Sequence, residues 1–390
     1  MDVVDVVLIV LVLLAAVHGL RLGAVVQILT FGGFLLGLLV GGALAVLLVS
    51  SVRSETTRDV VTLLLVLGLA VLIGVAGRVI GSWGHLALRR VHLGTLDGVL
   101  GVGVAAVAVL LSAWVLASVL TQSSYSWVNS QIQRSDVLRA IDDVLPPAPG
   151  VFAEVRTLLA DPSFPSVFAG VSPTAAPPVA VPSPDVAGTI AATAARSTLK
   201  VLGQACGYVQ EGSGFVAAPG LVVTNAHVVA GESSTQIQVG DVDYPATPVL
   251  YDPEFDLAIL RTGAPVGPPL AVDPDEAGRG AQGAVLGYPE NGPLSVKPAG
   301  VAAVLTAEGR DIYNQQNVVR KVYEIDADVQ PGNSGGPLVG TGGQVVGVVF
   351  SRSTVSDDVG YALASPGVLA RVQQAEQRTA RVGTGACTEG

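Results

Sequence analysis

The chain has 390 residues, half of them hydrophobic, and a formal net charge of −10 at pH 7. This length is enough for two or three domains with buried cores. Residues 1–121 hold 6 of the 21 Lys and Arg residues and 5 of the 31 Asp and Glu residues, so the remainder is strongly acidic. Such a field repels phosphate backbones, which excludes nucleic acid as a partner.

Four long apolar runs fill the first part of the chain. Each approaches or exceeds the roughly 20 residues that a helix needs to cross a bilayer. We therefore predict four transmembrane helices within residues 1–121, at residues 3–20, 23–49, 60–80 and 99–120. Further runs follow the first and no basic residue precedes it, which argues against a cleaved signal peptide. A soluble four-helix bundle, the alternative, needs polar helix faces that these runs lack.

Basic residues are divided unequally among the predicted loops. Four arginines lie in the first and third loops and two in the second. Because cytoplasmic loops carry an excess of Lys and Arg, we expect loops one and three inside and everything after residue 121 outside the cytoplasm. His85 and the other two histidines of this region lie near span ends, where we expect them to be solvated at the membrane interface.

The head of this region is "DVVLIVLVLLAAVHGLRLGAVVQI", with an acidic start and a glycine-rich first loop. Glycines recur in "FGGFLLGLLVGG", and small residues let membrane helices approach closely. The pattern resembles the four-span family named after colicin V production. That resemblance covers about a third of the chain and implies no particular chemistry.

Residues 122–189 connect the membrane region to the rest of the chain. Apolar residues at helical spacing in "NSQIQRSDVLRAIDDVL" predict a short juxtamembrane helix. The proline-rich run "SPTAAPPVAVPSP", residues 172–184, predicts an extended, semi-rigid spacer without a packed core. An exposed segment of this kind is also a natural site for proteolysis, which would release the domain that follows.

From residue 190 onward the chain carries short runs rich in Val, Ile and Leu, separated by Gly, Pro and Asp. Examples are "LVVTNAHVV", "LAILRT", "GAVLGYP" and "GQVVGVVF". Many short strands with turn residues between them predict an all-β barrel or sandwich over residues 190–390. One helix is expected near the end, in "SPGVLARVQQAEQ".

Three segments of this domain carry the residue types that acyl transfer needs. They are "TNAHVV" with His227, "DPEFDLAIL" with Asp256, and "QPGNSGGPL" with Ser334. A nucleophilic serine needs a base, a carboxylate that orients the base, and donors for the oxyanion. Taken singly, each segment is also compatible with a turn, a strand entry or a satisfied core histidine. Jointly, with His227 as the domain's sole histidine, they predict a catalytic triad.

These motifs, together with "GSGFV" and "VVGVVF", resemble trypsin-like serine proteases of the bacterial, HtrA-like branch over residues 197–373. The resemblance implies two six-stranded β-barrels with the active site between them. It implies Ser334 as the nucleophile, His227 as the general base and Asp256 as the orienting acid. Asp252 is the rival carboxylate, but it precedes Pro253 in an expected turn, so we favour Asp256.

The residues around the nucleophile carry two further expectations. By the same resemblance, the backbone N–H groups of Gly332 and Ser334, with Asn333 between them, form the oxyanion hole. Digestive and clotting proteases have an aspartate at the position of Asn333, which pairs with a newly cut N-terminus. Asparagine cannot form that ion pair, so activation by that route is not expected.

Substrate selection rests on two features. Asp328 lies six residues before Ser334, where trypsin has the acid that selects Arg or Lys, although Asp326 is an alternative pocket neighbour. The run "FSRS", comprising Phe350, Ser351, Arg352 and Ser353, matches the strand whose backbone pairs with an extended substrate. We therefore expect peptides bound by strand addition.

The chain has two cysteines, Cys206 and Cys387, both in the β domain. An oxidising location outside the cytoplasm favours a disulfide between them, with two free thiols as the alternative. Two cysteines are too few for a structural zinc site, and we expect neither a metal nor a cofactor.

The whole arrangement resembles the membrane-anchored serine proteases of actinobacteria. The resemblance implies a multi-pass protein of the cell membrane with an extracytoplasmic, periplasmic or cell-wall-side protease domain, protein or peptide substrates, and a role in envelope stress tolerance. The competing hypothesis is a scaffold, secretion or transport factor that acts through its membrane helices. Spans with almost no ionisable residues argue against ion-coupled transport. The sequence does not specify an oligomeric state.

Overall fold

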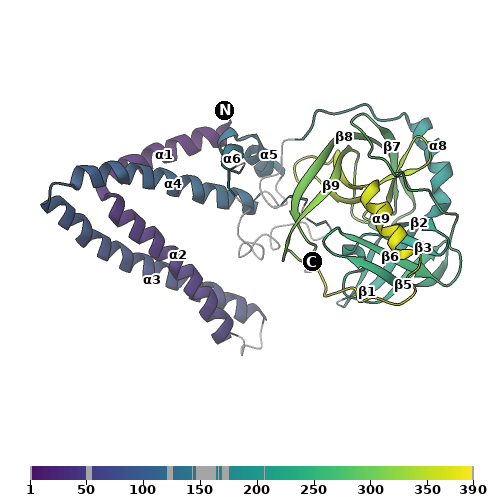
Figure 1. The fold of residues 1–390 in the computed structure, drawn as a ribbon, viewed down its shortest axis with the longest axis horizontal. Coiled ribbons are helices and arrows are strands. Elements are labelled where there is room, and N and C mark those ends of the chain that lie inside the picture. The colour runs from purple at the N-terminus through teal and green to yellow at the C-terminus, as the bar shows by residue number, and fades with distance from the viewer. Residues whose placement is uncertain are drawn as a thin grey trace. The chain divides into compact units, whose positions relative to one another are not determined.

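The structure is a computed structural model that describes residues 2–49, 55–120, 126–142, 144–145, 164–165, 167–168, 175–205 and 207–388. The chain divides into two compact units. The first comprises Met1–Leu116 and Ser135–Ile141, and the second comprises Ala117–Arg134 and Asp142–Gly390. Helices make up the first unit, and sheets dominate the second (Figure 1).

Long apolar helices form the first unit: α1 (Val3–Leu22), α2 (Ala24–Val49), α3 (Glu55–Arg90) and α4 (Gly94–Leu120). Among the described residues, three helices are long and apolar enough to cross a membrane, at Val3–Leu22, Leu64–Arg90 and Gly94–Ser118. The second predicted span coincides with α2, whose stretch Ala24–Leu38 is a shorter apolar helix. Large apolar side chains such as Leu13 and Leu72 are more than 60% exposed, as lipid-facing residues are (61% and 64%).

Glycines bring α2 and α3 close together. A Cβ atom added to Gly33 would lie 2.7 Å from the carbonyl oxygen of Ile73. One added to Gly37 would lie 2.5 Å from the Cα atom of Ala70. The predicted close approach of small residues is therefore present between these two helices.

The predicted third loop is mostly helical, because α3 continues to Arg90 and α4 begins at Gly94. Residues 81–90 contain no proline and include helix formers such as Leu and Ala, so nothing ends the helix earlier. The expectation that His85 is solvated was wrong. Its Nδ1 atom lies 2.6 Å from a carboxylate oxygen of Asp97, whose other oxygen accepts from the Val25 N–H at 3.0 Å.

Two short helices replace the single juxtamembrane helix that was predicted. They are α5 (Ser126–Arg134) and α6 (Asp136–Asp142), and Ser135 separates them. The Ser135 hydroxyl accepts a hydrogen bond from the Leu138 N–H at 3.2 Å and donates one to Asp5 at 2.6 Å. Ser135 therefore acts as the N-cap of α6, which explains why the helical pattern is interrupted there.

The second unit contains two closed antiparallel barrels of six strands each, which confirms the predicted chymotrypsin-like double β-barrel. The first barrel has the strand order β1 (Thr198–Ala205), β2 (Tyr208–Ala218), β3 (Leu221–Thr224), β6 (Leu257–Thr262), β5 (Val242–Asp252) and β4 (Glu232–Val239). The second has the order β10 (Pro337–Gly340), β11 (Val345–Arg352), β12 (Val359–Ala364), β9 (Asn317–Asp326), β8 (Ser295–Arg310) and β7 (Gln282–Gly287). Short 3-10 turns lie at η2 (Ala195–Ser197), η3 (His227–Val229) and η4 (Pro289–Asn291).

Two helices pack against the barrels. The predicted C-terminal helix is α9 (Ser365–Ala375), which buries Val368 and Val372 four residues apart on one face. A second helix, α8 (Pro184–Ala194), was not expected; it begins in the predicted linker and ends beyond the predicted boundary at residue 189. Ser183 caps it, and its residues Ala187, Ile190 and Ala194 are buried in the same apolar cluster as core residues of both barrels.

The described part of the proline-rich segment lies against the second barrel. Residues 175–183 contain no helix or strand, and residues 172–174 lie outside the described ranges. The Ala176 N–H donates to the Glu324 carboxylate at 2.6 Å, and the Val179 N–H donates to Asp326 at 2.5 Å. The spacer was expected to be unpacked, whereas β9 carboxylates bind its backbone donors here.

Candidate active site

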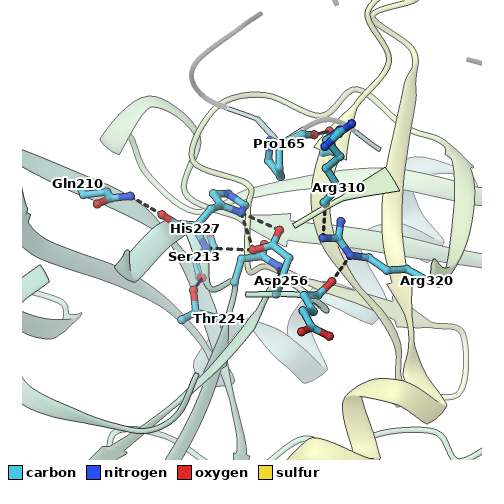
Figure 2. Close-up of polar contacts among 11 residues, drawn as sticks. Pro165, Gln210, Ser213, Thr224, His227, Asp256, Arg310 and Arg320 are labelled. Carbon is cyan, nitrogen blue, oxygen red and sulfur yellow. Dashed lines mark hydrogen bonds and ion pairs between the residues drawn. The ribbon is translucent and has the colours of Figure 1, made fainter. Parts of the chain in front are cut away.

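Strand pairing brings His227 and Asp256 together. Strands β3 and β6 are antiparallel partners, with Thr224 opposite Ala258, so the residues flanking this pair meet at one end of the first barrel. The His227 Nδ1 atom lies 2.8 Å and 3.0 Å from the two oxygens of the Asp256 carboxylate, and the His227 N–H donates to it at 3.0 Å (Figure 2). Asp256 is completely buried.

This geometry fixes the tautomer of the imidazole. An ionised carboxylate only accepts hydrogen bonds, so Nδ1 carries the hydrogen and Nε2 is left as the acceptor. The Nε2 atom is buried and has no hydrogen-bond partner among the described residues. The ring is therefore arranged to receive a proton at Nε2.

The loop that carries Asp256 is fixed by Asn225 and Arg320, two residues from other parts of the chain. Asp256 has a φ of 62°, a left-handed conformation that needs support, and the Asn225 amide donates to its carbonyl at 2.7 Å. The buried Arg320 on β9 donates from Nε to the Glu254 carbonyl at 2.6 Å (Figure 2). Burial lowers the pKa of the Arg320 guanidinium, and the nearby charge of Asp256 opposes this effect.

Asp252, the rival carboxylate, has a different set of partners. It accepts from the Arg371 Nε atom at 2.7 Å and from the Phe255 N–H at 2.9 Å. The Arg371 guanidinium also lies over the Phe255 ring, 3.6 Å from its centroid. Asp252 therefore joins α9 to the β5–β6 turn, while Asp256 is the acid that contacts the histidine.

Ser334 lies in a tight loop between β9 and β10. Gly332 and Gly335 flank it with φ values of 91° and 83°. A Cβ atom on Gly332 would lie 2.4 Å from the Tyr288 carbonyl oxygen, so only glycine fits. The Asn333 N–H donates to the Gln330 carbonyl at 3.0 Å, and the Asn333 side chain accepts from the Gln330 N–H at 2.9 Å.

The N–H groups of Gly332 and Ser334, the predicted oxyanion donors, differ from the N–H of Asn333 between them. Asn333 uses its N–H within the loop, whereas no described backbone carbonyl accepts from the N–H of Gly332 or Ser334. A developing oxyanion requires two N–H donors of this kind, which have no described backbone acceptor and are separated by a single residue. The Ser334 hydroxyl is also buried and has no partner among the described residues, so the Ser334–His227 hydrogen bond is not formed here. Such bonds often form only when substrate is bound.

Ser213 on β2 fastens the nucleophile loop to the first barrel, and sequence reasoning missed it. Its N–H donates to the Ser334 carbonyl at 2.8 Å, and its hydroxyl donates to the Gly332 carbonyl at 2.6 Å. The same hydroxyl accepts from the Tyr288 N–H at 2.8 Å, while the Ser213 carbonyl accepts from Thr224 at 2.7 Å (Figure 2). Through Ser213, the nucleophile loop is therefore linked to Thr224 at the end of β3, the strand that leads to His227.

The two acidic candidates for the specificity pocket are both engaged. Asp328 is half-exposed, pairs with the Lys297 ammonium at 2.7 Å and accepts from the Gln330 amide at 3.2 Å. Asp326 accepts from the linker at Val179, as described above. Lys297 therefore offsets the charge of Asp328, and Asp326 serves to hold the linker.

The run Phe350–Ser353 begins on β11 and continues past its end at Arg352. Phe350, Ser351 and Ser353 are buried, and Arg352 is partly exposed. Beside them, the Gly335 N–H donates to the Val349 carbonyl at 2.8 Å, which joins the nucleophile loop to this strand. The run therefore starts one residue beyond the point where that loop is attached.

The cysteine prediction falls partly outside the described residues, because Cys206 lies there. No described cysteine is free, and the Cys387 sulfur belongs to a disulfide. Near it, the Gly231 N–H donates to the Thr384 carbonyl at 3.0 Å, so the C-terminal segment covers the turn after His227. In the part of the chain that the structure describes, no group of three or more His, Cys, Asp or Glu side chains is placed to hold a metal ion.

Comparison with known families and proteins agrees with this architecture. Residues 212–348 match the trypsin-like peptidase domain, and residues 4–146 match the colicin V production protein family. The chain is 37% identical over 389 residues to the serine protease Rv3671c of Mycobacterium tuberculosis, covering 98% of each chain.

Other relatives match a smaller share of the chain. The Lactococcus lactis serine protease Do-like HtrA is 30% identical, covering 48% of this chain and 49% of the relative. A probable periplasmic serine endoprotease, DegP-like, of Chlamydia pneumoniae is 34% identical, covering 38% and 30%. The crystal structure of the active form of the Rv3671c protease from M. tuberculosis aligns with a TM-score of 0.53 and 40% identity, covering 57% of this chain and all of that one.

Proposed function

The chain belongs to the trypsin-like, HtrA-type family of serine proteases, and we propose that it cleaves extracytoplasmic proteins with Ser334, His227 and Asp256 as its catalytic triad. The observation that carries this proposal is the hydrogen-bonded pair of His227 and buried Asp256. It is supported by a nucleophile loop that Ser213 ties to the same barrel. No metal or cofactor is needed for this chemistry.

The site residues divide the steps of the proposed reaction among them. The Ser334 Oγ atom attacks the peptide carbonyl carbon while His227 Nε2 takes its proton, and Asp256 stabilises the resulting imidazolium. The N–H groups of Gly332 and Ser334 stabilise the oxyanion. His227 then gives the proton to the leaving amine, and water cleaves the acyl-enzyme by the reverse sequence of proton transfers.

The membrane helices suggest where this reaction occurs. Three helices in the described residues can anchor the chain in a membrane. With α2 as the fourth span, the distribution of arginines favours a second unit outside the cytoplasm. The Chlamydia pneumoniae relative, a probable periplasmic serine endoprotease, points the same way. We therefore assign a multi-pass membrane location and a role in cell-envelope stress.

Substrate selection follows from the groups around the nucleophile. The ion pair with Lys297 weakens Asp328 as a selector of basic side chains, so we propose no strong preference for Arg or Lys at the cleaved position. Phe350 to Ser353 provide the strand to which an extended peptide adds. A bridge between Cys206 and Cys387 holds the C-terminal segment beside the turn that follows His227.

A fluorophosphonate probe tests the triad directly, because it labels only an activated serine. The full-length chain in detergent micelles should be labelled, and Ser334→Ala should not be, with an unchanged thermal midpoint. Ser197→Ala is the matched control, since this buried serine lies outside the site and should leave labelling intact. Equal labelling of Ser334→Ala would contradict the assignment of the nucleophile.

A further inference from the structure

Part of the linker lies on the proposed substrate strand and on the strand beside it. Phe164, Pro165, Val167 and Phe168, here called the linker segment, belong to the second unit. The Ser351 hydroxyl donates to the Pro165 carbonyl at 2.7 Å, and Pro165 appears in the same view as the His227–Asp256 pair (Figure 2). The Arg352 guanidinium lies over the Phe164 ring, 5.4 Å from its centroid.

The linker crosses a row of directly paired residues on three strands. Ser351 on β11 is opposite Tyr361 on β12, which is opposite Glu324 on β9, so the three side chains share one face. Pro165 contacts Ser351, the Phe168 ring meets the Tyr361 ring edge-on at 5.7 Å, and the Ala176 N–H binds Glu324. The described linker residues therefore contact this face on all three strands, including the proposed substrate strand.

The backbone edge of the strand is not used by the linker segment. Strand β10 pairs with β11 only as far as Val348, and the nucleophile loop extends this pairing to Val349. Beyond that residue, on the side away from β12, no described backbone group pairs with residues 350–352. The linker segment contacts side chains here, without the ladder that a bound peptide forms.

The packing of the linker segment makes it a fixed surface. Val167 is 7% exposed and belongs to the apolar cluster that includes Tyr361, and Phe168 packs against the same cluster. Phe164 packs against a second cluster that includes Val349. Phe164, Pro165 and Phe168 remain partly exposed. They form an apolar rim beside an open strand edge.

We propose that the linker segment forms one wall of the substrate groove and selects peptides with an apolar or aromatic side chain at the position opposite Ser351. This inference rests on the proposed function, because it takes the open edge of β11 as the peptide-binding edge. Side chains of an added strand alternate between faces, so the residue opposite Ser351 lies on the face that carries Pro165 and Phe168. Its neighbours point away from this face. Phe164 lies against Arg352, the next residue along β11, whose side chain points to the other face.

The test measures side-chain preference on the full-length chain in detergent, shown to be uncut by mass spectrometry. Internally quenched peptides carry Phe or Ala at each position before the scissile bond in turn. At one position the parent should prefer Phe by about tenfold in kcat/KM, the scale of one apolar pocket contact. Phe168→Ala should reduce that ratio several-fold, and Phe168→Leu should largely restore it.

Val181→Ala is the matched control, because Val181 lies further along the same linker and is 44% exposed. It should leave the ratio unchanged. An unchanged ratio in both Phe164→Ala and Phe168→Ala, with thermal midpoints near the parent's, would overturn the proposal. Faster hydrolysis of every peptide by these variants would also overturn it, since the linker segment would then be an obstruction.

A binding measurement separates this inference from the proposed chemistry. If the parent neither reacts with fluorophosphonate nor cleaves peptides, the proposed function fails. Fluorescence anisotropy with labelled Phe and Ala peptides on Ser334→Ala still compares their Kd values. The proposal is supported if Ser334→Ala binds the Phe peptide more tightly than the Ala peptide and the double variant Ser334→Ala, Phe168→Ala does not. Equal Kd values for the two peptides in both proteins overturn it.

Discussion

The Ser213 N–H donates a 2.8 Å hydrogen bond to the carbonyl of Ser334, and the Ser213 hydroxyl donates to the carbonyl of Gly332. A strand of the first barrel thus holds both residues whose N–H groups are proposed to stabilise the oxyanion. Donors that are fixed before the reaction cost no reorganisation when charge develops. Ser213 is therefore a positioning residue for the chemistry at Ser334.

Ser213→Ala should slow the enzyme while preserving the fold. The substitution leaves the Gly332 carbonyl and the Tyr288 N–H without their partner, at a cost of about 1–3 kcal/mol in unfolding free energy. If half of that cost falls on the transition state, kcat drops by about two- to tenfold with little change in KM. Steady-state kinetics on a fluorogenic peptide measure the split. Ser233→Ala, at an exposed serine on β4, is the control and should change neither constant.

The sequence was sufficient to propose the triad residues, because each lies in a short motif whose neighbours fold locally. His227 follows a fully buried strand, and Ser334 lies between glycines that only a tight loop requires. The double barrel was also predictable, from the motif resemblance more than from the spacing of short strands. These features depend on residues close together in the chain.

Contacts between residues that lie far apart in the chain could not be predicted from the sequence. Ser213 and Gly332 are separated by 119 positions, and Arg320 and Glu254 by 66, so no local pattern links them. The same holds for the linker, where prolines suggested an unpacked spacer but β9 carboxylates bind its N–H groups. Helix α8 was missed because Pro184 was assigned to the spacer, whereas it occupies the first turn, where proline is tolerated.

Asp256→Asn should reduce kcat by far more than Asp252→Asn. An asparagine amide would donate to Nδ1 of His227, which places the ring hydrogen on Nε2 and removes the acceptor for the Ser334 proton. A loss on the order of 10,000-fold in kcat is expected from this tautomer change. Asp252→Asn weakens the ion pair with Arg371 and should lower the thermal midpoint, with kcat within about tenfold of the parent. A larger kcat loss for Asp252→Asn would reverse the assignment.

Reduction of the chain should lower both stability and labelling by fluorophosphonate. A bridge between Cys206 and Cys387 closes a loop that contains most of the second unit. In the chain-entropy model, closing a loop of this length stabilises the folded state by about 4–5 kcal/mol. Without it, the contacts of the C-terminal segment, such as Arg381 to the Ser233 carbonyl, are easily lost. Thermal unfolding with and without reductant measures the effect, and Cys387→Ser should reproduce it. Equal midpoints in both redox states would argue against the bridge.

Glu232 makes stability depend on pH in the direction opposite to an ordinary surface acid. It begins β4, is 5% exposed, and has one carboxylate oxygen that is buried without a hydrogen-bond partner among the described residues. Burial raises the pKa of this carboxyl to about 7, and a hydrogen bond from Thr235 opposes the effect. In the unfolded chain the same group titrates near 4.5.

The sign follows from proton binding. Between about pH 4.5 and 7 the folded state keeps a proton at Glu232 that the unfolded state has lost, so stability falls as pH rises through this window. Above about pH 7 the loss is complete, and the free energy of unfolding is lower by about 3 kcal/mol. Glu232→Gln should therefore raise the thermal midpoint at pH 8 and leave it nearly unchanged at pH 4. Glu308→Gln is the control at an exposed glutamate and should shift neither midpoint. Stabilisation by Glu232→Gln that is equal at both pH values would show that charge burial is not the cause.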